Sequence, residues 1–218
     1  NRLGHYETGD PVRGEAISPD INVTYLQEPV LVFWCNYQTE TTGKEWDRRW
    51  VRLLDRDGFQ KASYALASPE ATPGINPCAS PGTWHRHVVS VDPNLKFVKI
   101  SFLFNSMDHL YNDYPGWGVD DVILASTPKP GGGGDGVFAP DPIRELESFF
   151  APPQTSYATT FDDATDPTPW SLSGLWAVDG SPGNAPGGAA YTGTRSLNFN
   201  NGANFNTIAC LCRQQFYL

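Results

Sequence analysis

The chain has 218 residues, enough for one large domain or two small ones. It carries 15 Lys and Arg against 24 Asp and Glu, a net charge of −9, so it lacks the basic character that a nucleic-acid partner requires. No apolar run approaches the length of a membrane span. With 21 Gly, 19 Pro, many aromatic residues and a single Met, the composition indicates an all-β, loop-rich, secreted protein.

Strands are predicted in the first part of the chain wherever apolar residues alternate or run together between turn residues. They cover residues 21–25, 30–37, 50–55, 83–91, 98–105 and 119–124. The near-continuous apolar run at 30–37 predicts a strand that is buried on both faces. Residues 1–20 are polar and rich in turn residues, and the segment 59–84 is expected to be mostly loop.

The character of the chain changes after residue 126. Residues 127–149 are predicted to form a flexible linker, because four consecutive glycines stand between two Pro-rich stretches. One helical turn is expected at 143–150. Residues 150–218 then form a second part, with strand patterns of its own. The chain is therefore divided into 1–126, the linker, and 150–218.

Several motifs resemble one known family. The sequence Asn-Asp-Tyr-Pro-Gly-Trp-Gly-Val-Asp-Asp-Val at 112–122 resembles the last two strands of extracellular jelly-roll modules of the MAM-like group, which occur beside secreted peptidases and in surface proteins. Residues 14–22 and 31–58 resemble the middle of such modules. Segments of the second part resemble their opening strands: 159–170, 174–178 and 191–200. The resemblance implies an all-β fold, a jelly-roll β-sandwich.

The order of these motifs is permuted. The first part, 1–126, resembles the middle and C-terminal portion of a module, and 150–218 resembles its N-terminal portion. Either part alone would expose unpaired strand edges. The second part can complete its own chain, complete a neighbouring subunit head to tail, or belong to a tandem array. We expect completion between neighbours, which predicts a structural or adhesive subunit of an extracellular fibre or cell-surface array.

Two adjacent carboxylates mark the last predicted strand of the first part. Adjacent strand residues face opposite sides, so one of Asp120 and Asp121 is expected to point inward, where it needs a cation or hydrogen-bond donors. In the resembling modules, an acidic residue after the first-strand aromatic, here Asp162 or Asp163, helps to hold a structural cation. Together these residues predict a structural Ca²⁺ site where the second part meets the first.

Four cysteines and two histidines offer further chemistry. Cys210 and Cys212 are poorly placed to bond to each other, so in an oxidising compartment one or both would pair with Cys35 or Cys78. A buried thiol at Cys35 is the alternative. His85 and His87 share one face of a predicted strand and could bind a metal, but no third ligand lies near them in the sequence. Asn22 opens the glycosylation sequon Asn-Val-Thr.

No pattern indicates an enzyme, since the nucleophile and metallopeptidase motifs are absent from the sequence. Glu40 with Asp47, or Asp120 with Asp163, are better explained as loop acids and cation ligands than as a glycosidase pair. Aromatic residues could stack on glycans in a carbohydrate-binding module, chiefly Trp46, Trp117 and Tyr114, with Tyr111, Trp170 and Trp176 as further candidates. An accessory domain of a secreted peptidase is the third alternative. The expected partners are a second copy of the chain and glycans.

Overall fold

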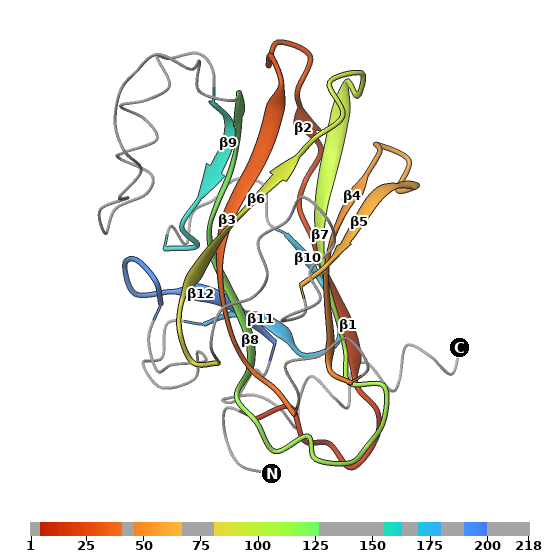
Figure 1. The fold of residues 1–218 in the computed structure, drawn as a ribbon, viewed down its shortest axis with the longest axis vertical. Coiled ribbons are helices and arrows are strands. Elements are labelled where there is room, and N and C mark those ends of the chain that lie inside the picture. The colour runs from red at the N-terminus through yellow and green to blue at the C-terminus, as the bar shows by residue number, and fades with distance from the viewer. Residues whose placement is uncertain are drawn as a thin grey trace.

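The fold is a β-sandwich of two antiparallel sheets packed face to face (Figure 1). A computed structural model describes residues 5–40, 46–66, 81–126, 155–162, 170–179 and 190–199. Within these ranges there are twelve strands and no helix. The strands are β1 (Arg13–Ile17), β2 (Ile21–Asn22), β3 (Pro29–Gln38), β4 (Arg48–Leu54), β5 (Gln60–Ala65), β6 (His85–Ser90), β7 (Phe97–Asn105), β8 (Gly116–Ser126), β9 (Thr155–Thr159), β10 (Ser171–Leu172), β11 (Trp176–Asp179) and β12 (Ser196–Phe199).

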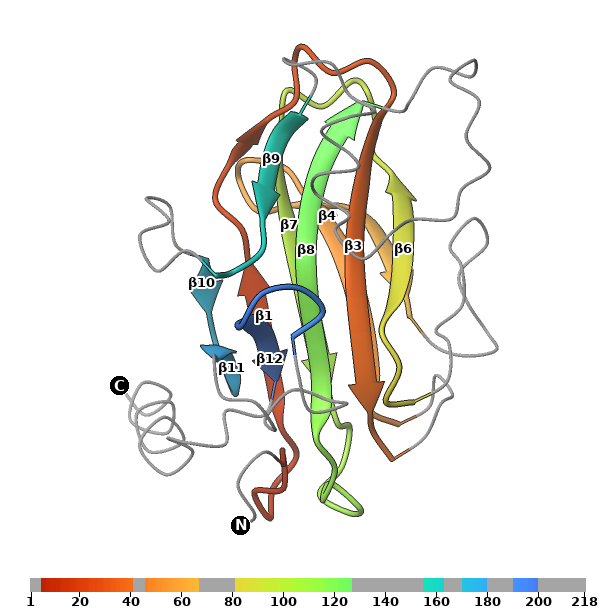
Figure 2. The ribbon, with the colours of Figure 1, turned by 90° about the vertical axis from the view of Figure 1, so that its left-hand side faces the viewer.

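Each sheet has six strands. The first has the order β10-β1-β7-β4-β5, with β2 also paired to β7, and the second has the order β11-β12-β8-β3-β6, with β9 also paired to β8 (Figure 2). Every pairing in both sheets is antiparallel. The all-β sandwich predicted from the sequence is therefore confirmed, while the jelly-roll connectivity stays a prediction.

The strand β3 is buried on both faces, as its apolar run predicts. Phe33 and Cys35 lie in the core between the sheets, whereas Val30 and Val32 belong to a smaller apolar cluster with Ile123. This second cluster also contains Ala125, with Val88 packed against it. Because successive side chains of a strand alternate between its faces, the two clusters lie on opposite sides of the same sheet.

Two strands of the first part occupy segments that the sequence pattern leaves outside strands. β1 lies in the polar stretch 1–20, where the Glu15 carboxylate is bonded to the Arg52 guanidinium and the Ser101 hydroxyl of neighbouring strands. β5 lies in the predicted loop 59–84 and ends the order of its sheet, with largely exposed polar side chains. β1 lies between β10 and β7, and β5 pairs with β4, so neighbouring strands hold both segments through backbone ladder bonds. Their side chains are mostly polar or small, and a local apolar pattern therefore does not predict them.

The second part of the chain completes both sheets of the first. β10 pairs with β1 in one sheet, and β12 and β9 pair with β8 in the other. In the structure of the single chain these pairings are formed within the chain. Completion between neighbouring chains stays a prediction. Ala125 is paired with Thr155, so the end of β8 and the start of β9 lie side by side. The predicted linker and helical turn lie outside the described residues.

A short segment of the second part, 170–179, passes from one sheet to the other. Its first strand, β10, pairs with β1 of one sheet, and its second strand, β11, pairs with β12 of the other. Between them, Gly174 has a φ of +65°, and a Cβ on it would lie 2.7 Å from the Cα of Gly14. Only two glycines permit this close approach of backbones. The segment closes the side of the sandwich next to β1.

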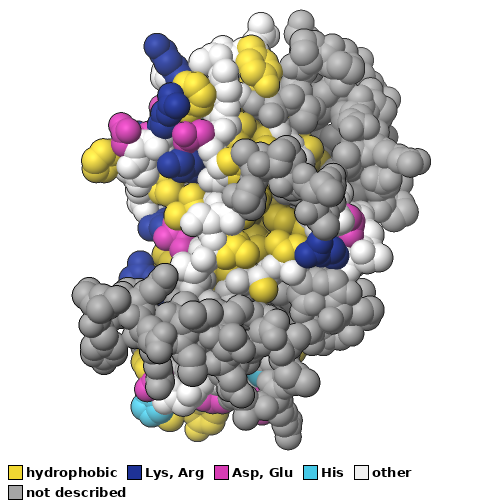
Figure 3. Space-filling view, turned by 180° about the vertical axis from the view of Figure 1, so that it is seen from behind, with side chains coloured by type: hydrophobic (Ala, Val, Ile, Leu, Met, Phe, Trp, Pro, Cys, Tyr) yellow, Lys and Arg dark blue, Asp and Glu magenta, His cyan; other side chains and the backbone are white. Residues whose placement is uncertain are grey.

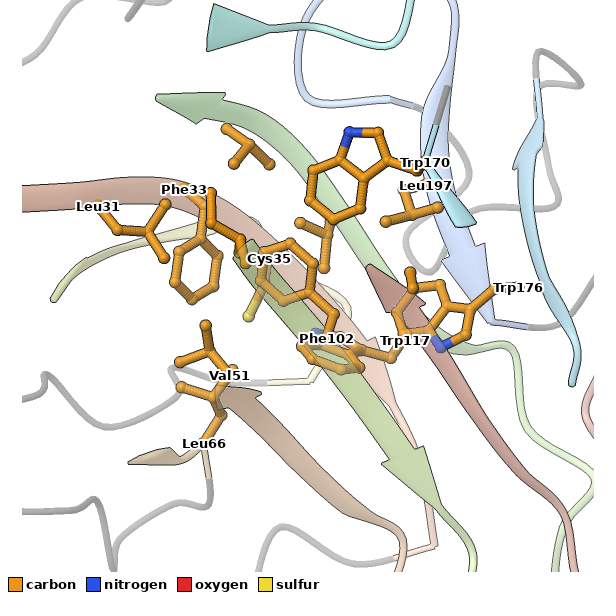
Figure 4. Packing of buried hydrophobic residues seen from close by; sticks show 14 of the residues in the cluster. Leu31, Phe33, Cys35, Val51, Leu66, Phe102, Trp117, Trp170, Trp176 and Leu197 are labelled. Carbon is orange, nitrogen blue, oxygen red and sulfur yellow. The ribbon is translucent and has the colours of Figure 1, made fainter. Parts of the chain in front are cut away.

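Both parts contribute to one hydrophobic core (Figure 4). The Phe102 ring packs edge-on against Phe33 and Trp117, at centroid distances of 5.1 and 5.7 Å, and stacks on Trp170 of the second part at 5.7 Å. Trp117 in turn packs edge-on against Trp176, at 5.2 Å. Such aromatic pairs contribute about 0.5–1.5 kcal/mol each beyond the burial of their area. The second part is thus needed to cover the core of the first.

Candidate functional site

The two adjacent aspartates of β8 lie at a β-bulge. Val32 pairs with Ile123 and Trp34 pairs with Asp120, so Asp121 and Val122 together stand opposite the single residue between them on β3. Asp121 has a φ of +46°. A bulge of this kind interrupts the alternation of side chains. The prediction that the two carboxylates face opposite sides is therefore wrong in detail: both reach the same loop of the second part.

That loop covers residues 190–195, just before β12, and lies across β8 (Figure 2). The Asp120 Oδ2 accepts hydrogen bonds from the backbone N–H groups of Tyr191 and Thr192, at 2.9 and 3.3 Å. The Thr192 hydroxyl donates to Asp121 Oδ1 at 2.7 Å. Both aspartates are fully buried. The carboxylates of the first part therefore hold a loop of the second part, and this junction is the candidate functional site.

Asp162 holds the same loop from the other side. Its Oδ1 accepts hydrogen bonds from the backbone N–H groups of Thr194 and Arg195, at 2.7 and 2.9 Å. Between these contacts stands Gly193, with a φ of +61° and no room for a Cβ beside the Asp162 carboxylate. Three of the four predicted cation ligands thus converge on 190–195. The fourth, Asp163, lies outside the described residues.

The pKa of Asp120 at the junction is far above the ordinary value of an aspartate. Burial, and next the neighbouring carboxylate of Asp121, raise the pKa of Asp120 to about 8. The backbone N–H groups of Asp121, Tyr191 and Thr192 act in the opposite direction but do not outweigh burial. Two buried acids side by side favour a bound proton or a bound cation near neutral pH. Perturbed carboxylates of this kind also mark candidate functional sites.

Aromatic rings cover the junction. The Tyr191 ring stacks on Trp34 of β3, with centroids 3.9 Å apart, and lies tilted against Trp84 at 6.0 Å. Arg86 stands opposite Trp34 in the β3–β6 ladder, and its burial lowers its pKa. The rings and the strands keep water from the carboxylates, which strengthens each hydrogen bond to them.

The predicted calcium ligands do not form a compact ligand cluster. Within the described ranges, three ligand atoms come close together at another place, on the side chains of Cys35, His85 and His87. The sequence pattern included the two histidines but had no third ligand for them. Cys35 supplies it from the neighbouring strand, at a sequence distance that no local motif reveals.

Of the four cysteines in the predicted disulfides, the structure describes only Cys35. Cys35 is buried in the core of β3, and Cys78, Cys210 and Cys212 lie outside the described residues. Among the residues that the structure covers there is no disulfide. The pairing of the cysteines therefore stays a prediction.

Three of the six rings proposed for glycan stacking are buried. Trp117 is fully buried and packs in the core, so it is not a stacking platform. Trp170 and Trp176 are core residues as well. Trp46 is 41% exposed and Tyr114 is half-buried. The sequon residue Asn22 is exposed, and its Oδ1 accepts hydrogen bonds from the N–H and hydroxyl of Thr24.

A second buried carboxylate belongs to the Glu40–Asp47 pair considered above. Asp47 is fully buried, and its Oδ2 accepts hydrogen bonds from the Tyr6 hydroxyl and the Glu40 backbone N–H, both at 2.6 Å. Burial raises the pKa of Asp47 to about 6, although these two bonds lower it. Because its acceptor oxygen serves Tyr6 and a backbone group, Asp47 is a structural residue that ties the N-terminal segment to β4.

No helix in the described ranges is long and apolar enough to cross a membrane. Comparison with models of known protein families found no match, and a search of curated proteins found none. The resemblance to MAM-like modules therefore stays a prediction. The sandwich and its junction are the findings from which a function is inferred.

Proposed function

We propose that this chain is a structural or adhesive subunit of an extracellular fibre or surface array, whose second part can complete the sandwich of a neighbouring subunit. One observation carries the proposal: β9, β10, β11 and β12 join both sheets by strand addition and bring core residues with them. Strand addition combines many backbone hydrogen bonds with side-chain burial, which makes such contacts strong. The same contacts can be formed within a chain or between chains.

The junction supports the proposal, because its contacts join the two parts through specific groups. Asp120 and Asp121 belong to the first part, and the loop 190–195 that they hold belongs to the second. In the proposal a Ca²⁺ ion, bound by the adjacent carboxylates of Asp120 and Asp121, replaces the proton that the buried pair would otherwise carry. Calcium takes only oxygen ligands, which this set supplies. Metal binding would then be coupled to the docking of the second part.

A cross-link tests whether docking occurs within or between chains. Ile17 on β1 stands opposite Ser171 on β10, so cysteines at both positions are close enough to form a disulfide. We expect the I17C/S171C variant of the native assembly to give covalent ladders on a non-reducing gel. A matched pair within one hairpin, W50C/A65C, should give monomers only. A monomer band from both pairs, with compact particles in the electron microscope, would reject assembly by strand exchange.

Carbohydrate binding is the second candidate, favoured by exposed rings at one end of the molecule. Tyr111 in the β7–β8 connection is 72% exposed, and Trp46 at the start of β4 is 41% exposed. Met107 and Leu110 are exposed in the same connection, and hydrophobic side chains are visible at the lower end in Figure 3. A glycan array probed with the monomer tests this alternative. Binding that is lost on Trp46→Ala and Tyr111→Ala would support it, and an absence of binding would reject it.

A further inference from the structure

A cluster of three metal-binding side chains lies between the sheets, on β3 and β6. The Cys35 Sγ is 3.2 Å from His85 Nε2 and 3.3 Å from His87 Nε2, and the three atoms all lie within 4.8 Å of one another. The ladder explains the arrangement: Cys35 stands directly opposite His85, and His87 follows two residues later on the same face. Both histidines are then within reach of one sulfur.

The second observation concerns the outer nitrogen of His85. Its Nδ1 lies 3.1 Å from the Thr83 carbonyl oxygen. A carbonyl oxygen only accepts hydrogen bonds, so Nδ1 carries the proton and, in the neutral ring, Nε2 keeps its lone pair toward Cys35. Metal-binding histidines typically donate their other N–H to a carbonyl or carboxylate in this way. His85 is thus oriented as a ligand before any ion binds.

Packing holds the other two groups in place. Cys35 and His87 are fully buried, and the His87 ring stacks on Phe33 with centroids 4.9 Å apart. His85 is half-buried and packs edge-on against Tyr37 at 6.2 Å. The two buried groups are rigid, and the half-buried His85 gives the cluster a side that meets solvent. An ion can therefore enter beside His85.

The two sulfur–nitrogen distances are close to those of a small transition-metal site. Zinc binds sulfur at about 2.3 Å and imidazole nitrogen at about 2.0–2.1 Å, so a tetrahedral site places sulfur and nitrogen roughly 3.5 Å apart. The two separations in the structure are shorter than this by about 0.3 Å, which small side-chain rotations supply. Thiolate and imidazole ligands favour zinc, cobalt and copper over calcium or magnesium. This site is therefore chemically distinct from the carboxylates of the junction.

We propose that Cys35, His85 and His87 bind one divalent transition-metal ion of the zinc class. Three protein ligands leave the fourth tetrahedral position for water or another donor. The ion joins β6, which ends the order of its sheet, to the central strand β3. It stabilises the folded state, since the ligand set is assembled only when the two strands pair. The proposal does not depend on how the subunits assemble.

Cobalt is the probe for the test, because it occupies zinc sites and gives visible absorption. The reduced, chelator-treated full chain is titrated with Co²⁺ and then with Zn²⁺. We expect one equivalent of cobalt to bind with a sulfur-to-cobalt charge-transfer band, and zinc to displace it. The variant H85Q should weaken binding by at least about tenfold, and C35S should abolish the charge-transfer band. The exposed histidine gives the matched control, H109Q, which should bind like the original chain.

Two further measurements decide the result if C35S does not fold. The unaltered chain should melt at a higher temperature with Zn²⁺ than with chelator, and the shift should be smaller in H85Q. A triple variant, C78S/C210S/C212S, should keep the cobalt band. The proposal is overturned if the folded, reduced chain shows neither a cobalt band nor a zinc-dependent shift, or if both persist in H85Q. Peptide mapping that finds Cys35 in a disulfide would overturn it as well.

Discussion

At the scale of single residues, burial decides the protonation of the acidic side chains. Asp47 and Asp120 are both fully buried, and burial is the largest cause of the raised pKa of each. They differ in their neighbours. For Asp47, the hydrogen bonds from Tyr6 and the Glu40 N–H favour the charged form and come before the opposing Glu40 carboxylate. For Asp120, the carboxylate of Asp121 opposes the charged form and is the largest cause after burial. The pKa of Asp120 is consequently the higher of the two.

A pH dependence of stability follows from Asp47. Its pKa rises from an ordinary value of 3.8 to about 6 in the folded state, so the folded chain holds more protons than the unfolded chain between these values. The stabilisation is fully present below about pH 4 and is lost as the pH rises to about 6. We expect Asp47→Asn to reduce the fall in the free energy of unfolding across this window by roughly 1–3 kcal/mol. The fall that comes from Asp120, whose pKa is raised to about 8, should remain in the variant.

Urea titrations at half-unit steps of pH between 4 and 7 provide the measurement. Asn keeps an oxygen for the bonds from Tyr6 and Glu40, so the variant changes the charge more than the contacts. The control is Asp57→Asn, an exposed acid in the turn after β4. A slope that is unchanged in the Asp47 variant would show that another group titrates in this window.

Calcium binding at the junction predicts a second effect at the residue scale. Ca²⁺ should raise the melting temperature relative to chelator, because an ion that binds only the folded state stabilises it, by about 2.7 kcal/mol at a hundredfold excess over Kd. In Asp121→Asn the increment should disappear, since one carboxylate is lost from the ligand set. Asp57→Asn again serves as the control. An equal calcium increment in both variants would place the ion elsewhere.

At the scale of elements, the second part is held by close backbone contact as well as by side chains. A Cβ on Gly14 of β1 would lie 2.5 Å from the Ser173 carbonyl oxygen and 3.0 Å from the Gly174 Cα. These atoms belong to the turn between β10 and β11, which carries the chain from one sheet to the other. Backbone atoms cannot move aside as a flexible side chain can, so this contact depends on glycine.

Gly14→Ala should therefore loosen the second part. We expect a loss of about 1–3 kcal/mol, the usual cost of overpacking a well-packed site. Hydrogen exchange should show the loss of protection concentrated in β10, β11 and β12. The control is Ser171→Ala on the exposed face of β10, which should change stability by less than about 0.5 kcal/mol. Equal protection of both parts in Gly14→Ala would show that the turn adapts to the added methyl group.

At the scale of the whole molecule, the connection between β8 and β9 controls which chain the second part completes. Ala125 and Thr155 stand opposite each other, so the connection is formally a long hairpin. A hairpin needs at least about two residues in its turn. Deleting 127–154 leaves only Ser126 between these paired residues, and β9 can no longer fold back onto its own β8. Its pairing is then available only to another chain.

We expect chains with this deletion to form dimers or longer assemblies and no folded monomer, measured by light scattering after size-exclusion chromatography. A variant in which 127–154 is replaced by a five-residue Gly-containing turn should stay monomeric if the original chain is monomeric. Comparison of the two variants shows whether the length of the connection or its particular sequence controls the assembly. A monomeric, fully folded deletion variant would show that the β8–β9 ladder is dispensable for the fold.

The sequence by itself determined the fold class and most strands of the first part, since the period of two records which side chains face the core. β3, β4, β6 and β7 follow their predicted segments closely, whereas β8 extends beyond its predicted segment 119–124 at both ends. It also indicated that Asp120, Asp121 and Asp162 lie near the junction, through motifs that resemble the end and the opening strand of one module. β1 and β5 were not predicted, because their polar side chains are stabilised by other strands of the sheet and a local sequence pattern does not record such contacts.

Only the tertiary structure decided which side chains meet. The bulge at Asp121 turned two alternating carboxylates toward one loop, because one extra residue in a strand shifts the faces of its neighbours. The β3–β6 ladder placed Cys35 beside His85, fifty positions further along the chain. Pairing register depends on the burial of both strands at once. Local periodicity therefore predicts the strands, while contacts between distant residues create the two candidate sites.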